Sequence, residues 1–270
     1  MNIDTEDFSW VGNQETFVDH PNVKLLNHIV VGRYGGNSEA GQYKNEDGCL
    51  VWSDEKNDWE FVILLDAHNS SESAELILEQ INSKKVQLKQ MLCNPSIQFT
   101  FKGLEETVLN LFQSENFLAQ CRGVTGETAC LIVARKDKYV WWFSVGDCIL
   151  FLHHKELATM GQFQLNQRQF YEWIGQVNTF EQDVPCYSIG TKELRQGENH
   201  LLLTTDGLIE CPNNPLTDPN DIFNTFSYLD EKEAIGSILD KIRENNVRDS
   251  TTIVSWKLEI LKSASRASNQ

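Results

Sequence analysis

Phe61-Val62-Ile63-Leu64-Leu65-Asp66-Ala67-His68 is the stretch of sequence that decides the fold. Its five consecutive apolar residues predict a strand that is buried on both faces. An ionised carboxylate at the end of such a strand must reach water or meet a cation, and water is the simpler interpretation. However, residues 69–71 offer helix N-caps, and an apolar helical face recurs over residues 72–91. We therefore expect Asp66 at a strand-to-helix corner.

Composition limits the class of protein. The chain has 270 residues, of which 40% are hydrophobic, and this is enough for one large domain with a sizeable core. Its formal net charge of −16 makes nucleic acid and anionic membranes unexpected partners, whereas an acidic site could hold divalent metal. Seven scattered cysteines without a C-x-x-C pair are typical of reduced thiols. With no signal-peptide or membrane-helix pattern, the sequence indicates a cytoplasmic protein, which we expect to be a monomer.

Hydrophobic periodicity predicts strands grouped on both sides of two tandem helices. The expected strands are residues 27–34, 48–52, 59–65, 128–134, 139–145, 149–153, 200–205 and 251–258, and the expected helices are 71–92, 104–120 and 230–244. Consecutive strands without an intervening helix favour antiparallel pairing, and the pattern indicates a layered α+β fold. We assign residues 25–260 to a single domain, residues 1–24 to a polar lead-in and residues 261–270 to a frayed tail.

Acidic residues collect at the ends of the predicted strands. They are Glu46, Asp47, Asp66, Asp147, Asp206 and Asp249. Any one of them alone is more often a turn acid that faces water. Several carboxylates on one rim of a sheet would repel one another unless hard cations lay among them, and oxygen ligands are typical of magnesium and manganese. The set therefore predicts a Mg²⁺ or Mn²⁺ site.

The segments around these acids resemble the motifs of the metal-dependent protein serine/threonine phosphatases of the protein phosphatase 2C type. In family order they are Lys44-Asn45-Glu46-Asp47-Gly48, Asp66-Ala67-His68, Gly126-Glu127-Thr128-Ala129, Val145-Gly146-Asp147-Cys148, Thr205-Asp206-Gly207-Leu208 and Asp249-Ser250-Thr251-Thr252. Each is weak alone, but the ordered set is specific. The resemblance covers about residues 27–257. It implies a central antiparallel β-sandwich flanked by helix pairs, in four layers.

The resemblance also implies roles for individual residues. Asp66 would bridge two ions, Mg²⁺ or Mn²⁺; Asp206 and Asp249 would bind one of them, and the carbonyl of Ala67 the other. Ala67 replaces the usual glycine, and alanine is acceptable there in a β conformation. The remaining implied metal residues are Glu46 and Asp47, as direct ligands or holders of bound water, and Asp147, near which some family members hold a third ion, with Glu210 as a helper.

One departure concerns the substrate phosphate. Family members commonly carry an arginine four residues before the glutamate of the first motif. Here Gln42 stands at that position, and its neutral side chain cannot form a charged fork. Arg33 and Lys44 are the candidates to replace it as phosphate-binding residues. Gln42 therefore leaves open whether the chain turns over substrate efficiently.

Two functions follow from these residues. Two divalent ions can lower the pKa of a bridging water and clamp phosphate oxygens. The first function is thus hydrolysis of phosphoserine and phosphothreonine in proteins by a metal-bridging hydroxide, in signalling, with no phosphoenzyme. Asp66 and His68 would be its catalytic residues, and His68 would protonate the leaving oxygen. The alternative is a phosphatase-fold binding or regulatory module with weak or no turnover, which Gln42 favours, whereas retention of every acid favours the enzyme.

Overall fold

Strands with alternating outward and inward side chains form the centre of the protein in the computed structural model, which describes residues 5–265. A seven-stranded sheet contains β1 (Thr5–Val11), β4 (Gly48–Asp54), β5 (Trp59–His68), β6 (Glu127–Lys136), β7 (Tyr139–Val145), β9 (Ile174–Gly175) and β10 (Ser188–Glu193). A five-stranded sheet contains β2 (Asn22–Leu26), β3 (Ile29–Tyr34), β8 (Ile149–His153), β11 (Gly197–Thr204) and β12 (Thr251–Ile260). All of their strand pairs are antiparallel.

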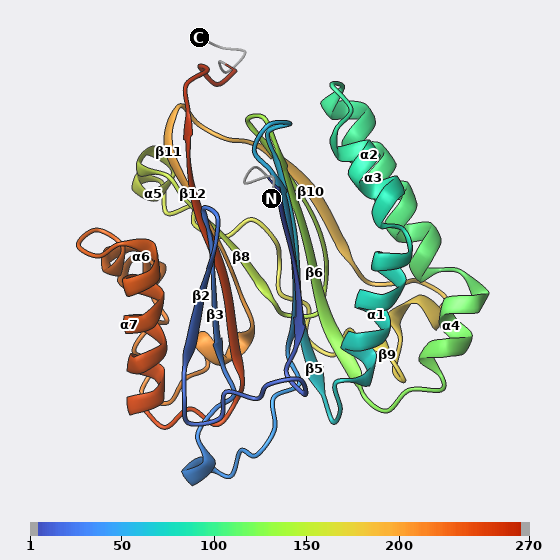
Figure 1. The fold of residues 1–270 in the computed structure, drawn as a ribbon, viewed down its shortest axis with the longest axis vertical. Coiled ribbons are helices and arrows are strands. Elements are labelled where there is room, and N and C mark those ends of the chain that lie inside the picture. Colours follow the sequence, from blue (N-terminus) through green and yellow to red (C-terminus); the bar gives the residue numbers. More distant parts are fainter. Residues whose placement is uncertain (1–4, 266–270) are drawn as a thin grey trace.

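Helices cover the outer face of each sheet (Figure 1). Beside the seven-stranded sheet lie α1 (Glu72–Ser83), α2 (Lys85–Leu92), α3 (Ile97–Phe112) and α4 (Glu115–Cys121). Beside the five-stranded sheet lie α6 (Pro219–Thr225) and α7 (Glu231–Glu244), and the short α5 (Lys155–Thr159) follows β8. Short 3-10 turns span Ser38–Ala40, Thr179–Glu181 and Asp206–Leu208. The four layers confirm the predicted α+β sandwich flanked by helices.

The central run Phe61–Leu65 of strand β5 is apolar, and both of its faces are buried. Phe61, Ile63 and Leu65 pack in the core cluster between the seven-stranded sheet and its helices. Val62 and Leu64 pack in the cluster between the two sheets. Side chains alternate along a strand, so even-numbered positions of β5 face the other sheet. This alternation directs the side chain of residue 66 toward the space between the sheets.

The N-terminal segment differs from its prediction as a polar lead-in. Thr5–Val11 forms β1, which pairs with β4 along its whole length and makes Trp10 part of the core between the sheets. The prediction failed because a short edge strand with a mostly exposed outer face has little apolar pattern of its own. The division into domains stays a prediction, and of the expected frayed tail, residues 266–270 lie outside the described part of the chain.

Other boundaries shift by a few residues. The strand expected over residues 27–34 begins at Ile29, because Asn27 has a positive φ of 50° in the turn after β2. The helix expected over residues 71–92 is two helices that meet at Lys84, and the next helix begins at Ile97. The apolar face predicted for residues 230–244 is confirmed in α7, whose buried residues include Ile235, Ile238 and Ile242 among others.

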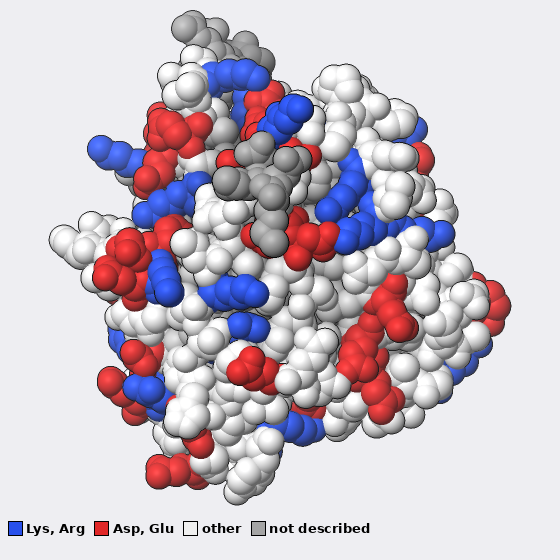
Figure 2. Space-filling view, viewed as in Figure 1, with Lys and Arg blue, Asp and Glu red and all other residues white. Residues whose placement is uncertain are grey.

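The surface carries both signs of charge. On the face seen in Figure 2, Lys and Arg side chains occur singly or in small groups among acidic ones. Within residues 5–265, no helix combines the length and apolar character that crossing a membrane requires. The net charge of −16 is thus not gathered in one patch on this face.

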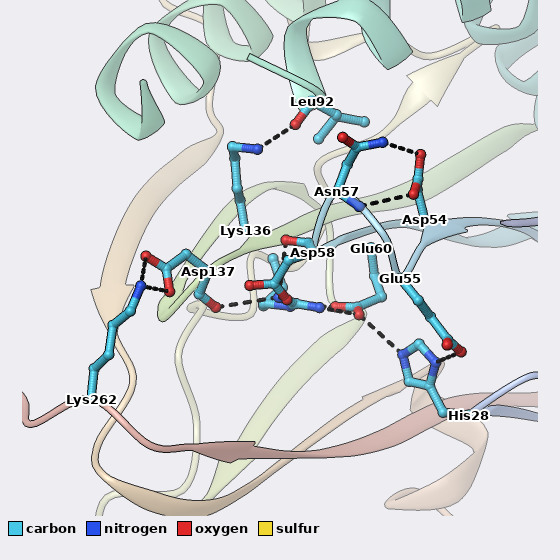
Figure 3. A network of polar contacts seen from close by, with 11 residues as sticks. His28, Asp54, Glu55, Asn57, Asp58, Glu60, Leu92, Lys136, Asp137 and Lys262 are labelled. Atoms are coloured by element: carbon cyan, nitrogen blue, oxygen red, sulfur yellow. Dashed lines mark hydrogen bonds and ion pairs between the residues drawn. The ribbon is translucent and has the colours of Figure 1, made fainter. Parts of the chain in front are cut away.

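A network of ion pairs joins the two sheets at the start of β5 (Figure 3). Glu60 is buried, and its carboxylate accepts hydrogen bonds from Arg135 on β6 and lies 3.0 Å from Nε2 of His28 in the β2–β3 turn. Burial would raise the pKa of Glu60, but Arg135 and His28 outweigh it and lower the pKa to about 2. This buried acid is therefore ionised and neutralised by its neighbours.

Candidate metal centre

Three carboxylates from different strand ends meet between the two sheets. Asp66 lies in β5, three residues before Asn69, whose positive φ of 69° ends the strand. Asp206 begins the turn directly after β11, and Asp147 lies between β7 and β8. One carboxylate oxygen from each of these acids lies within 4.8 Å of the others. The sandwich thus brings together Asp66, Asp147 and Asp206, which are distant in sequence.

Burial makes this group electrostatically costly. Asp66 is 2% exposed and Asp206 8% exposed, and each has a buried carboxylate oxygen without a hydrogen-bond partner in the described chain. Burial, followed by repulsion from Asp249 and the other nearby acids, raises the pKa of Asp206 to about 8. Burial and then the charge of Asp206 raise the pKa of Asp66 well above its usual value. A bound cation would oppose both shifts, because it favours the ionised form of each acid.

The donor set fits a hard divalent cation. The converging atoms are carboxylate oxygens, and the searched residues bring no histidine or cysteine into the group. Oxygen-only sites of this kind are typical of Mg²⁺ and Mn²⁺. Within residues 5–265, one buried oxygen of Asp66 and one of Asp206 lack the partners that buried carboxylates normally have, and a bound ion would provide one.

Asp47 holds the loops that carry two of the other acids. It is completely buried, and its carboxylate accepts hydrogen bonds from Ser250 Oγ at 2.6 Å, Thr252 Oγ1 at 2.7 Å and Thr205 Oγ1 at 3.3 Å. Thr205 precedes Asp206, and Ser250 follows Asp249. Direct metal binding by Asp47 would compete with these hydroxyls. Its contacts instead suit a residue that positions Asp206, after β11, and Asp249, before β12.

A cleft of about 390 Å³ opens beside the acids. Its lining includes the predicted site residues Lys44, Glu46, Ala67, His68 and Asp249, and also Gln42, Asn69, Glu210, Pro212, Val247 and Arg248. His68 Nδ1 lies 4.0 Å from Asp66 Oδ1, and the His68 side chain is 38% exposed. Lys44 forms an ion pair with Glu46 and donates a hydrogen bond of 2.8 Å to the carbonyl of Asn69. The side chains of Lys44 and His68 therefore line the same cleft as Asp249.

The structure does not bring Arg33 to this cleft. Its guanidinium lies against the rings of Trp10 and Phe17, with its central carbon 5.0 Å and 4.4 Å from their centroids. Arg33 Nη2 also donates a hydrogen bond of 2.5 Å to Asn22 Oδ1. The side chain of Arg33 is buried beside β1 and its neighbours and does not line the cleft, and its predicted phosphate-binding role stays a prediction. Of the two candidates, only Lys44 lies at the cleft.

Two arginines at the site were missed in the sequence. Arg248 lines the cleft next to Asp249, and its position before that acid was the only available signal. Arg168 Nη2 lies 2.6 Å from Glu210 Oε1, 3.6 Å from Asp147 Oδ2 and 3.9 Å from Asp206 Oδ2. Arg168 belongs to the irregular segment between α5 and β9, whose composition gives no periodic pattern.

Comparisons with solved structures define the fold. The chain is similar to a bacterial serine phosphatase, with a TM-score of 0.60 and 14% identity over 88% of this chain and 99% of that one. It is also similar to the Mycobacterium tuberculosis serine/threonine phosphatase PstP/Ppp (TM-score 0.57, 14% identity, 94% and 99% covered). RsbX in complex with magnesium gives a TM-score of 0.54 at 15% identity, with 88% and 100% covered.

These similarities show that the chain has the protein phosphatase 2C fold. No protein-family model matches the sequence, and no curated protein matches it either. The fold implied by the six short motifs is therefore confirmed. At 14–15% identity, the comparison extends to the fold, and the chemistry depends on the acids described above.

Proposed function

We propose that this protein hydrolyses phosphoserine and phosphothreonine in phosphorylated proteins with the help of two divalent metal ions. The observation that carries the proposal is the burial of Asp66 and Asp206 in one acidic group, where each has a carboxylate oxygen without a hydrogen-bond partner within residues 5–265. The solved serine/threonine phosphatases with the same fold support it, as does the magnesium complex of RsbX. We expect the protein to act as a cytoplasmic monomer.

In this proposal Asp66 would contribute a ligand to each of the two ions. Asp206 and Asp249 would help to hold one ion, the carbonyl of Ala67 would help to hold the other, and Glu46 would hold bound water. When bound, Mg²⁺ or Mn²⁺ would lower the pKa of a water molecule and neutralise the charge on phosphate oxygens. Asp47 keeps the segments of Asp206 and Asp249 in place through its hydroxyl contacts. The buried acids thus provide fixed negative charge where the ions are needed.

The cleft residues act on the substrate. His68 is partly exposed and 4.0 Å from Asp66, so its ring can reach the cleft and donate a proton to the leaving serine or threonine oxygen. Lys44 and Gln42 both line the cleft, and Lys44 supplies a positive charge that the neutral side chain of Gln42 cannot. Its Nζ is already held by Glu46 and the Asn69 carbonyl, so it is oriented before substrate binds. Lys44 is therefore the proposed phosphate-binding residue.

The test is phosphatase activity on p-nitrophenyl phosphate and on a phosphoserine peptide with Mn²⁺. We expect activity to be abolished by chelation and by Asp66→Asn. Asp183→Asn is a matched control, because Asp183 is exposed and the same substitution there changes a charge far from the acids in sequence. Full activity of Asp66→Asn, or activity that resists chelation, would contradict the proposed chemistry.

The second candidate is a phosphoprotein-binding module with weak turnover. It is favoured by Gln42, which is 9% exposed and lines the cleft where a charged fork would grip phosphate. Metal-dependent binding of a phosphopeptide, measured by calorimetry, without release of phosphate over hours would select this candidate. Release of phosphate that follows Mn²⁺ concentration would select the enzyme.

A further inference from the structure

A guanidinium fills the side of the acidic group that faces Asp147 and Glu210. Arg168 Nη2 lies 2.6 Å from Glu210 Oε1, 3.6 Å from Asp147 Oδ2 and 3.9 Å from Asp206 Oδ2. Asp66, by contrast, has no basic partner within the described residues other than His68, at 4.0 Å. We infer that Arg168 is the resident cation of the Asp147–Glu210 side and confines divalent ions to the group formed by Asp66, Asp206 and Asp249. This inference rests on the proposed metal-dependent function.

Arg168 is held by more than its charge. Its Nε donates a hydrogen bond of 3.2 Å to the carbonyl of Asp147, and its guanidinium carbon lies 4.6 Å from the centre of the Phe170 ring. The side chain is 18% exposed, against 51% for Glu210. Contacts with a backbone carbonyl, an aromatic ring and carboxylates already restrict the conformation of Arg168. Staying beside Asp147 therefore costs this side chain little additional conformational entropy. The geometry is therefore that of a positioned cation and not of a freely moving surface arginine.

A metal ion and this guanidinium exclude each other at Asp147. The closest contact takes one oxygen of Glu210, and the same nitrogen faces Asp147. A divalent ion bound there would need those oxygens at about 2.0–2.1 Å and would be repelled by the positive guanidinium. Asp66 differs, because its buried Oδ2 has no partner within the described residues. The acids are thus divided into a part with a built-in cation and a part that requires an added one.

The test counts bound ions. Mn²⁺ per chain is measured by equilibrium dialysis with elemental analysis, and free Mn²⁺ by electron paramagnetic resonance. We expect two ions for the wild type, and three for Arg168→Met, with the additional ion bound at least tenfold more weakly. Adding Asp147→Asn to Arg168→Met should return the count to two. Arg168→Lys, which keeps the charge, should also bind two.

Arg122→Met is the matched control. Arg122 likewise pairs with two carboxylates, those of Glu115 and Glu181, but it lies at the end of α4 outside the acidic group. Its removal should leave two bound ions. If Arg122→Met gains an ion as Arg168→Met does, exposure of any two acids is sufficient and the inference is overturned.

Further outcomes separate this inference from the proposed function. Three ions in the wild type, with one lost in Asp147→Asn, would overturn the role of Arg168 while metal dependence stands. Two ions in both Arg168→Met and the wild type would overturn it as well. A wild type that binds no Mn²⁺ would remove the proposed function itself. If circular dichroism shows that Arg168→Met does not fold, the comparison of wild type with Asp147→Asn still decides, because equal counts support the inference.

Discussion

Replacing Asp206 with asparagine should stabilise the metal-free protein while removing one of its proposed metal ligands. Asp206 is 8% exposed, and burial together with repulsion from Asp249 and Asp147 raises its pKa to about 8. Asparagine has nearly the same shape and carries no charge. The substitution therefore removes the repulsion without creating a cavity, and a gain in stability is expected wherever no cation compensates the acids.

The sign and size follow from linkage between protonation and folding. The carboxyl of Asp206 has a pKa of about 8 in the folded protein and about 4 in the unfolded chain. Its ionisation therefore lowers the unfolding free energy as pH rises from about 4 to 8, with no further loss above pH 8. At pH 7 the shift has acted over roughly three pH units above the unfolded pKa. At 1.36 kcal/mol per unit, this corresponds to a loss of about 4 kcal/mol in unfolding free energy. Because the acids share their repulsion, we expect about 2–4 kcal/mol in practice. For a chain of this length that is an increase in Tm of about 4–8 °C.

The assay is thermal unfolding in chelator at pH 5, 7 and 8, followed by circular dichroism. The Tm of the wild type should fall from pH 5 to pH 8. The Tm of Asp206→Asn should fall less, so that the difference between the two proteins is largest at pH 8. Added Mn²⁺ should stabilise the wild type and narrow the difference. Asp183→Asn, at an exposed position, should behave as wild type. An Asp206→Asn protein that folds but melts at or below the wild-type Tm at pH 8 in chelator would refute the reasoning.

Three other changes test separate parts of the protein. Lys44→Ala should raise KM for a phosphoserine peptide by about 5–30-fold with a smaller change in kcat, because it removes charge that binds phosphate in both ground and transition states; an unchanged KM would exclude that role. His68→Ala should lower kcat on the peptide by about 10²–10⁴-fold but affect p-nitrophenyl phosphate much less, since that leaving group needs no proton. Equal losses on both substrates would contradict a proton donor. Glu60→Gln should reduce the unfolding free energy by about 3 kcal/mol in urea titrations, because the buried charge of Arg135 loses its buried carboxylate partner and keeps only the largely exposed Asp58. A loss below about 1 kcal/mol would show that the network contributes little.

The sequence predicted most of the sandwich because its strands are long and apolar. The run before Asp66 is buried on both faces, and the ranges 139–145 and 149–153 agree with β7 and β8. Edge strand β1 escaped prediction because its stability comes from pairing with β4, a partner distant in sequence, and not from its own pattern. The elements that could be predicted are thus those whose own sequence has a strong hydrophobic pattern.

The site was predicted less evenly. Acids at strand ends could be found because each follows a hydrophobic run, and Asp66, Asp147 and Asp206 do converge. The neighbours of basic residues could not be found in this way. Arg33 looked available, but aromatic residues from β1 and the following loop enclose it, and Arg168 reaches the acids from a segment without periodicity. Side-chain environments made by distant segments require the three-dimensional structure.

Strand β5 itself supplies an argument that the acids are functional. Glu60 and Asp66 are even-numbered positions of the same strand, and both are 2% exposed. Near the start of the strand, Arg135 and His28 neutralise Glu60 and lower its pKa to about 2. Near its end, burial and then the charges of Asp206 and other acids raise the pKa of Asp66. A fold that can place an arginine beside one buried acid of this strand could have done so beside the other. Within residues 5–265, Asp66 has no basic partner other than His68, and this supports the proposed binding of a cation from solution.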